Sequence, residues 1–278
     1  MNLILEKRTL NNNTIFMRVS APYVAAKALP GQFIILRPAA DSERIPLTIA
    51  GYDRANGTID LIFQTVGAST MRLGTLDADE YIADLVGPLG NPSALDNFTS
   101  VAVVGGGLGC AIAYPQAKYL AEHGCRVDII SGFRSKDVII LEDEMRACSD
   151  RLVLLTDDGS NGNKGLVTDG LRSLIDGGTK YDAVIAIGPP IMMKFVCKLT
   201  KEFGIKTIVS LNPIMIDGTG MCGGCRVTVG GKMKFACVDG PDFDGHEVDF
   251  DELMRRNSMY REKESHDCNL FKGANANA

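Results

Sequence analysis

Hydrophobic and polar residues alternate in short runs over the first hundred positions of the chain. Alternation with a period of two, and enrichment in β-branched residues, are typical of strands with one buried face. Turn-forming residues in "LPG", "RPAAD" and "DRANG" separate the runs. Such a series of short strands predicts a small antiparallel β-barrel over residues 1–97. Its candidate strands are "TIFMRV" (14–19), "QFIILR" (32–37), "IPLTIAGY" (45–52), "TIDLIFQTV" (58–66) and "EYIADLVGP" (80–88).

The pattern changes near residue 98, where buried-type apolar runs begin to alternate with segments of helical spacing. Strand and helix repeated in turn predict an α/β domain, a parallel sheet with helices on both faces, over residues 98–211. The expected strands are "SVAVVGGG" (100–107), "RVDIISGF" (126–133), "RLVLLTD" (151–157), "YDAVIAIGPP" (181–190) and "KTIVSL" (206–211). The expected helices are "PQAKYLAEHG" (115–124), "LEDEMRACS" (141–149), "TDGLRSLID" (168–176) and "MMKFVCKLTKEFGI" (192–205).

The C-terminal residues divide into two further parts. Residues 212–250 are rich in glycine and cysteine and contain only short strand-like pieces, which predicts a small cofactor-binding segment. Residues 251–278 are expected to form a charged helix, "FDELMRRNSMYREKE", followed by a frayed tail, "CNLFKGANANA" (268–278).

Composition narrows the class of protein. With 278 residues, 45% hydrophobic and 23% charged, the chain is expected to be globular with more than one domain. A net charge of −5 argues against general nucleic-acid binding. No window approaches the length of a membrane span, and "MNLILEKRTL" lacks the features of a signal peptide. We therefore expect a cytoplasmic chain whose eight cysteines are thiols or metal ligands.

A glycine-rich turn joins the first strand of the α/β domain to its first helix. Gly105, Gly106, Gly107 and Gly109 allow a tight turn and a close approach of backbone amides to a phosphate. The turn is not a clean G-x-G-x-x-G, because its last position is Cys110, and "IISGFRS" ends the next strand without an acidic residue. A simple Rossmann dehydrogenase is therefore disfavoured, and a tight turn without a ligand is the alternative.

Three cysteines in the third segment have the spacing of iron–sulfur ligands. Cys222 and Cys225 are separated by two residues, and Cys237 follows after eleven more. The plant-type 2Fe–2S pattern is C-x4-C-x2-C…C, and Asp217 occupies the place of its first cysteine. A carboxylate can ligate iron as a hard oxygen donor. We therefore predict a 2Fe–2S site formed by these four residues.

Other arrangements of this site remain open. Cys268 in the tail and His246 are rival fourth ligands, and a three-ligand or zinc site is a further alternative. Asp217 can also be read as an ordinary turn residue before glycines.

Two segments of the predicted barrel resemble flavin-binding motifs of the ferredoxin-NADP reductase superfamily. "RIPLTIA" (44–50) is similar to its Arg-x-aromatic-Ser/Thr-x-x motif, although Pro46 and Leu47 stand where an aromatic residue is frequent. The resemblance implies that Arg44 contacts the FAD pyrophosphate and Thr48 the isoalloxazine edge. "IFQTVGASTMRL" (62–73) resembles the second segment, in which a short helix offers amides to the pyrophosphate. The implied FAD-binding residues are Arg44, Pro46, Leu47, Thr48, Ile49, Ala50, Phe63, Gln64, Gly67, Ser69 and Thr70.

Two segments of the α/β domain resemble the nucleotide side of the same superfamily. In "AIGPPIMMKFV" (186–196), the resemblance places Gly188 and Pro189 around the nicotinamide. "TDDGSNGNKGLVTD" (156–169) contains Asp157 and Asp158, which near the ribose would repel a 2′-phosphate and favour NAD(H) over NADP(H). Cys110 is expected near the nicotinamide side.

The three parts together resemble one branch of this superfamily. It contains the electron-transfer subunit of type B dihydroorotate dehydrogenase and the small subunit of NADH-dependent reduced ferredoxin:NADP+ oxidoreductase, also called the sulfide dehydrogenase beta subunit. The first group carries a cysteine at the position of Asp217, so the second group is more similar. This resemblance implies a redox enzyme subunit with FAD, NAD(H) and a 2Fe–2S cluster, in which the cofactors supply the chemistry.

The same resemblance implies the partners. They are a larger flavoprotein subunit with a second FAD and 4Fe–4S clusters, in a bifurcating heterodimer, and ferredoxin reached through that subunit. A dihydroorotate dehydrogenase partner and a non-catalytic redox or zinc module are the alternatives.

Overall fold

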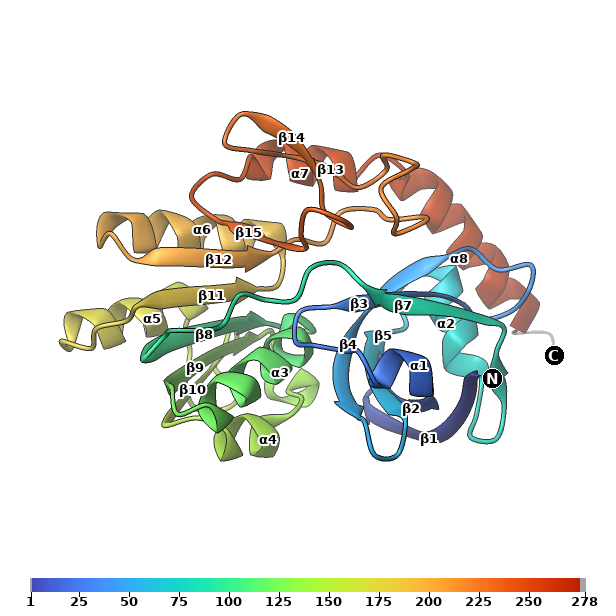
Figure 1. Cartoon of the computed structure of the whole chain (residues 1–278), viewed down its shortest axis with the longest axis horizontal. Helices are drawn as coiled ribbons and strands as arrows, with labels where there is room; N and C mark the ends of the chain where they lie inside the picture. The colour runs from blue at the N-terminus through green and yellow to red at the C-terminus, as the bar shows by residue number, and fades with distance from the viewer. Residues whose placement is uncertain (1, 276–278) are drawn as a thin grey trace.

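The computed structural model describes residues 2–275, and its N-terminal part is an antiparallel barrel (Figure 1). Seven strands pair in the order β6-β1-β2-β5-β4-β3-β7. The predicted barrel is therefore confirmed, although β1 was not anticipated, because charged residues interrupt its apolar pattern. The elements are β1 (Asn2–Asn11), β2 (Thr14–Ser20), α1 (Pro22–Ala25), β3 (Phe33–Arg37), β4 (Ile45–Asp53), β5 (Thr58–Gln64), α2 (Ala68–Thr75), β6 (Tyr81–Ile82) and β7 (Asp84–Leu89).

Alternation along the strands builds the core of the barrel. Ile59, Leu61 and Phe63 on β5 are fully buried, as are Ile34 and Leu36 on β3. Since successive side chains of a strand point to opposite faces, these residues all point inward.

The second domain is a six-stranded sheet covered by helices, in the order β10-β9-β8-β11-β12-β15, where β15 (Asp242–Asp244) comes from the C-terminal segment. The first five strands are parallel, as expected, and the sixth is antiparallel. Val101 and Val103 of β8 pack with α3, whereas Ala102 and Val104 pack in the cluster beneath α5 and α6. The elements are β8 (Ser100–Gly106), α3 (Gly109–Glu122), β9 (Arg126–Phe133), the 3-10 turn η1 (Lys136–Val138), α4 (Glu142–Ala147), β10 (Arg151–Thr156), α5 (Val167–Asp176), β11 (Ala183–Ile187), α6 (Pro190–Glu202) and β12 (Lys206–Ser210).

Helix α3 of the α/β domain packs against the barrel. Its residues Ala111 and Ala113 share one hydrophobic cluster with Phe16, Ala50 and Ile62 of the barrel. Small side chains on α3 allow this close approach. The barrel is thus packed against the α/β domain beside the carboxyl ends of its parallel strands (Figure 1).

The C-terminal segment crosses both domains (Figure 1). It contains β13 (Arg226–Val229), β14 (Lys232–Phe235), β15 (Asp242–Asp244), α7 (Phe250–Asn257) and α8 (Arg261–Asn275). The three-residue strand β15 is the edge strand of the sheet of the α/β domain. The C-terminal segment is therefore hydrogen-bonded to that domain through β12.

The frayed tail differs from the expectation. Helix α8 continues through Asn275 and packs against α2 of the barrel, while residues 276–278 lie outside the described part. Asp267 and Cys268 on α8 are half-buried, and this packing holds in place a helix whose own composition is strongly polar. None of the helices in the described part of the chain is long and apolar enough to cross a membrane.

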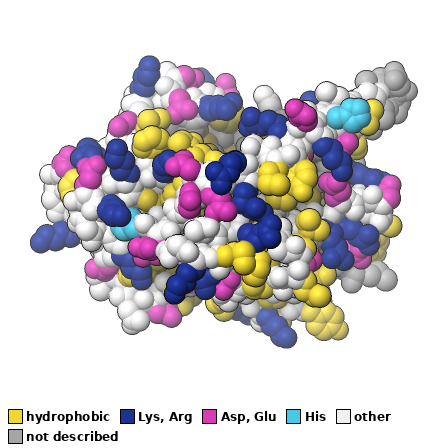
Figure 2. Space-filling model, turned by 90° about the horizontal axis from the view of Figure 1, so that it is seen from above, with side chains coloured by type: hydrophobic (Ala, Val, Ile, Leu, Met, Phe, Trp, Pro, Cys, Tyr) yellow, Lys and Arg dark blue, Asp and Glu magenta, His cyan; other side chains and the backbone are white. Residues whose placement is uncertain are grey.

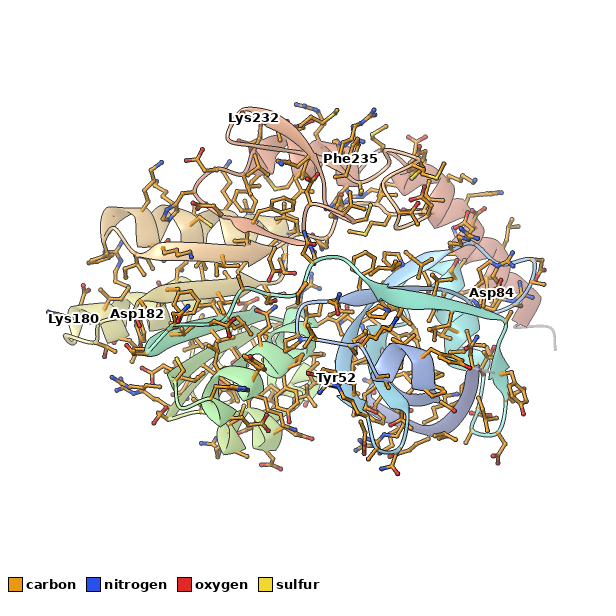
Figure 3. All side chains as sticks on the ribbon, viewed as in Figure 1. Tyr52, Asp84, Lys180, Asp182, Lys232 and Phe235 are labelled. Atoms are coloured by element: carbon orange, nitrogen blue, oxygen red, sulfur yellow. The ribbon has the colours of Figure 1, made fainter. Side chains whose placement is uncertain are left out.

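The carboxylate of Asp182 lies at the end of the parallel sheet that is away from the barrel (Figure 3). Its Oδ2 atom accepts hydrogen bonds from the Thr99 amide (2.6 Å), the Thr99 hydroxyl (2.8 Å) and the Ser100 amide (3.0 Å). These donors, the Thr99 amide first, hold the pKa of Asp182 below its usual value.

We expect Asp182→Asn to lower Tm at neutral pH and to have little effect in acid. A carboxylate whose pKa is lowered by folding stabilises the protein above its unfolded pKa of about 4, and this contribution disappears as the pH falls through the folded pKa. Thermal unfolding followed by circular dichroism across this pH range measures the difference. A gap between wild type and variant that is as large in acid as at neutrality would contradict the expectation.

Candidate functional site

A cleft of about 1110 Å³ lies between the barrel and the carboxyl ends of the parallel strands. Barrel strands β3, β4 and β5 form one wall, and the turns after β8, β9, β10 and β11 form the other. The residues that follow β12 close the cleft on the side of the C-terminal segment. Open α/β sheets bind ligands at this edge.

The barrel wall contains part of the predicted flavin site. Pro46, Leu47 and Thr48 line the cleft together with Gln64. Phe33 also lines it and pairs with Thr48 across the β3–β4 ladder.

Other predicted flavin residues stand behind this wall. Ile49 and Phe63 are buried in the core of the barrel, and Ala50 is buried at its contact with α3. They support the strands and do not line the cleft.

The predicted pyrophosphate residues lie at the start of β4 and α2. Arg44 is exposed immediately before β4 and forms no ion pair within residues 2–275. Helix α2 begins one residue after Gly67, and Ser69 lies in its first turn. The Thr70 hydroxyl accepts the amide hydrogens of Val66 (3.2 Å) and Gly67 (3.0 Å), which fixes the entry to the helix beside the cleft.

The glycine turn brings bare backbone to the opposite wall. Gly106, Gly107 and Gly109 line the cleft. Gly107 has a left-handed φ of +55°, and a Cβ on Gly109 would stand 2.2 Å from the carbonyl oxygen of Ile187. Gly107 is therefore needed for its left-handed backbone, and Gly109 for the close approach of α3 to the carbonyl of Ile187.

Cys110 lies beneath the turn and is fully buried. A Cβ on Gly105 would stand 2.7 Å from its sulfur, so the thiol fills the space under the glycine backbone. Burial raises the pKa of Cys110 to about 12, against a weaker opposite effect of Ser131. Neither Cys110 nor Gly105 lines the cleft.

The Gly-Pro pair faces the glycine turn. Gly188 and Pro189 line the cleft, and α6 begins at the next residue. The side chain of Met192 fills the space between the two turns, because a Cβ on Gly106 would meet its sulfur at 2.4 Å and one on Gly188 its methyl group at 2.8 Å.

The two predicted specificity residues lie differently. Asp157 lines the cleft at the end of β10, whereas Asp158 accepts hydrogen bonds from the amide (2.9 Å) and hydroxyl (2.7 Å) of Ser160. The Ser160 hydroxyl, followed by its amide, holds the pKa of Asp158 below its usual value. Asp158 therefore stabilises its own loop, and Asp157 presents the negative charge to the cleft.

Sequence reasoning missed several residues of the cleft wall. Arg134 follows β9 and lines the cleft close to Asp157, which follows the neighbouring strand β10. Its position directly after a strand was a usable signal, because carboxyl ends of parallel strands meet at one edge. Met192 and the exposed Phe195 follow the Gly-Pro pair on α6, where helical spacing indicated only a packed helix.

A hairpin explains the spacing of the last two cysteines. Cys225 directly precedes β13, and Cys237 follows β14 after one intervening residue. Gly230 and Gly231, both with left-handed φ, form the two-residue turn. The hairpin returns the chain on itself, so the two sulfurs lie 3.2 Å apart.

The loop before the hairpin brings in the other two predicted ligands. Asp217 accepts hydrogen bonds from the amides of Thr219 (2.9 Å) and Cys222 (2.8 Å). Cys222 is exposed, whereas only 2% of Cys225 and 2% of Cys237 is exposed.

Helix α7 and the barrel hold this loop in place. The guanidinium of Arg256 donates to the Gly224 carbonyl at 3.2 Å. Gly218 packs on the barrel, since its Cβ would meet the side chains of Leu89 and Ile35 at 2.7 and 2.9 Å.

The donor set fits an iron–sulfur cluster. Burial, and then the neighbouring Cys225 sulfur, raise the pKa of Cys237 to about 12, so a nearby cation would favour its thiolate form. No three His, Cys, Asp or Glu side chains between residues 2 and 275 converge tightly enough to hold a single ion. Three thiol donors and one carboxylate are chemically suited to a 2Fe–2S cluster.

The rival fourth ligands lie elsewhere. The Cys268 sulfur lies 3.7 Å from the Val66 carbonyl on the barrel side of α8. The His246 ring is hydrogen-bonded to the Thr200 hydroxyl at 3.0 Å, in the α/β domain. Asp217 alone among the three shares a loop with Cys222.

Comparison with known proteins gives consistent relatives. Residues 212–249 match the model of the iron-sulfur cluster binding domain of dihydroorotate dehydrogenase B. An uncharacterised protein of Clostridium beijerinckii is 52% identical over 95% of this chain and 92% of its own length. A Thermotoga maritima homologue of the dihydroorotate dehydrogenase B (NAD(+)) electron transfer subunit is 47% identical over 95% of this chain and 93% of its own.

One solved structure is similar over its full length. It belongs to a study of the NADH-dependent reduced ferredoxin-NADP oxidoreductase and of flavin-based electron bifurcation. The matched chain has a TM-score of 0.93 and 44% identity, and the match covers 98% of each chain.

Barrel, nucleotide-type sheet and cysteine loop together define an iron–sulfur flavoprotein of the ferredoxin reductase-like fold. The chain belongs to the family of electron transfer subunits that contains those of dihydroorotate dehydrogenase B and their homologues. Its cofactors are FAD, NAD(H) and a 2Fe–2S cluster.

We expect Gly109→Ala to slow the reduction of bound flavin by NADH by about tenfold, because displacement of a turn by an ångström misaligns reacting groups. The new Cβ would displace α3 from the carbonyl of Ile187, next to the Gly-Pro pair. Anaerobic stopped-flow measures the rate, and the flavin spectrum measures FAD content, which should not change.

Gly273→Ala is the matched control for this variant. It lies on α8, where a new Cβ would meet no atom of the described side chains within 4 Å, and helix propensity favours alanine. Equal rates for Gly109→Ala and this control would contradict the role assigned to the turn.

Proposed function

We propose that this chain is the electron-transfer flavoprotein subunit of a flavin-based electron-bifurcating, NADH-dependent ferredoxin:NADP+ oxidoreductase. One observation carries the proposal. The barrel forms one wall of the cleft, and the loop that contains the cysteines packs on the same barrel. The full-length similarity to a chain of such an enzyme supports it.

When bound, FAD would accept a hydride from NADH and release electrons one at a time to the cluster. The chain itself has to bind, orient and shield these groups. Thr48 and Phe33 would face the flavin, while Arg44 and the first turn of α2 would neutralise its pyrophosphate. Gly188 and Pro189 would position the nicotinamide from the opposite wall.

The cluster loop and the cleft meet at strand β3. Ile35 contacts the position of Gly218 in the loop, and Phe33, two residues earlier on the same strand, lines the cleft. Electron transfer falls steeply with distance, so this short path favours exchange between the two cofactors. Asp217, Cys222, Cys225 and Cys237 are proposed as the four ligands.

The charge of the cleft supports NAD(H) as the nucleotide. Asp157 would lie near the ribose and repel a 2′-phosphate. Arg134 in the same wall is available for the pyrophosphate.

The exposed side of the cluster loop is the proposed docking surface for the larger subunit. Met221 is 89% exposed and lies beside the exposed Cys222, with Ile216 and Val238 close by. Hydrophobic patches between charged side chains are visible on this face in Figure 2. Exposed apolar groups of this kind mark protein interfaces, and the proposed partner carries a second FAD and 4Fe–4S clusters and passes electrons to ferredoxin.

A dihydroorotate dehydrogenase subunit is the second candidate partner, favoured by the matched cluster domain. The catalytic subunit that co-purifies with the chain from its source cells distinguishes the two.

The anaerobic visible spectrum of the purified chain, before and after NADH, tests the proposed function. We expect overlapping flavin and iron–sulfur bands, and bleaching of both by NADH. NADPH should bleach them more slowly, because Asp157 opposes a second phosphate. A chain that binds FAD and iron during reconstitution, yet is not reduced by NADH, would rule the proposal out.

We expect Asp217→Ala to lose or destabilise the cluster and Cys268→Ala to retain it. The carboxylate shares the ligand loop, whereas the Cys268 thiol lies against the barrel. Iron and sulfide content and the cluster spectrum measure the outcome, and Asp217→Cys should keep a cluster with an altered potential. Loss in Cys268→Ala with retention in Asp217→Ala would move the fourth ligand to α8.

A further inference from the structure

A half-buried hydroxyl–carboxylate pair lies where the three parts of the chain meet. The Ser93 hydroxyl donates to the Asp242 carboxylate at 2.6 Å. Ser93 belongs to the connection between β7 and β8, and Asp242 is the first residue of β15, five positions after Cys237. The pair thus joins the interdomain connection to the end of the cluster segment.

Backbone hydrogen bonds surround this pair on both sides. The Asn91 amide donates to the Gly240 carbonyl (2.7 Å), and the Leu211 amide donates to the Pro241 carbonyl (2.9 Å). The Ser93 amide donates to the carbonyl of Pro30 in the barrel (2.9 Å). Barrel, α/β domain and cluster segment are therefore tied together within a few residues.

The junction lies directly behind the wall of the cleft. Pro241 lines the cleft and also contacts Gly90, whose Cβ would stand 3.0 Å from its ring. Ser210, the ladder partner of Asp242, lines the cleft as well. A shift here would move the segment that carries Cys237 relative to the flavin wall.

The environment of Asp242 makes its hydrogen bond important. Its Oδ1 atom is shielded from solvent. Burial raises the pKa of Asp242, while the nearby hydroxyls of Ser93 and Ser210 act in the opposite direction. Removing a donor from a desolvated carboxyl costs more than removing one at the surface.

We infer that Ser93 and Asp242 form a clamp that positions the cluster segment against the flavin barrel and so sets the rate of electron transfer between flavin and cluster. Both are positioning residues, since neither belongs to the donor set or lines the cleft. This inference rests on the proposed function, because it assigns a role within that electron path.

Ser93→Ala, Asp242→Asn and the control Thr99→Val test the clamp in the reconstituted full chain. Thr99→Val removes a hydroxyl–carboxylate hydrogen bond of similar length at the opposite end of the sheet. Hydrogen–deuterium exchange reports the amides of Asn91 and Leu211. Anaerobic stopped-flow with NADH separates flavin bleaching from cluster reduction.

Ser93→Ala should expose both amides and slow cluster reduction by about tenfold, with flavin bleaching changed by less than about twofold. Asp242→Asn keeps an acceptor for the hydroxyl and should behave as wild type, as should Thr99→Val. Wild-type exchange in Ser93→Ala, or cluster reduction at the wild-type rate, overturns the clamp. A wild-type cluster that NADH does not reduce overturns the proposed function instead, and the exchange comparison still decides whether the clamp holds the segment.

Discussion

The antiparallel pairing of β15 with β12 is the constraint on which the arrangement of the two cofactor sites depends. The ladder joins Asp242 to Ser210 and Phe243 to Val209, only five positions after Cys237. Once β15 is part of the sheet, the preceding loop has to lie over the barrel, because the chain between them is short. One wall of the cleft and the last cysteine thus belong to a single continuous segment.

The burial of the three cysteines gives the cluster site a direction. Cys225 and Cys237 are enclosed by the hydrophobic core that also contains Phe33 of the cleft wall, whereas Cys222 is exposed beside Met221. An electron carrier needs a short distance to its donor and another to its acceptor. In the proposed site, a buried side next to the flavin and an exposed side at the surface would meet both needs without movement of the domains.

Local patterns predicted the parts of the structure that are determined locally. Alternating residues located β2 to β5, and the C-x2-C-x11-C spacing singled out Cys225 and Cys237, which the hairpin brings together. The strand β15 and the packing of α8 depend on partners far away in sequence. In addition, β15 has only three residues, which is too short for an alternating hydrophobic pattern. Within β4, Thr48 lines the cleft and Ile49 is buried in the core of the barrel, a distinction that the motif does not make.

As the proposed fourth ligand, Asp217 would change the cluster without changing its formal charge. An ionised carboxylate and a thiolate each bring one negative charge, so a difference in potential from an all-cysteine site has to come from the type of donor and its hydrogen bonds. The amide of Thr219, and to a lesser extent that of Cys222, hold the pKa of Asp217 below its usual value. The carboxylate is therefore charged at neutral pH, whereas burial raises the pKa of the Cys237 thiol. The proposed site would thus contain one anion before assembly, and the Cys237 thiol would lose its proton as the cluster binds.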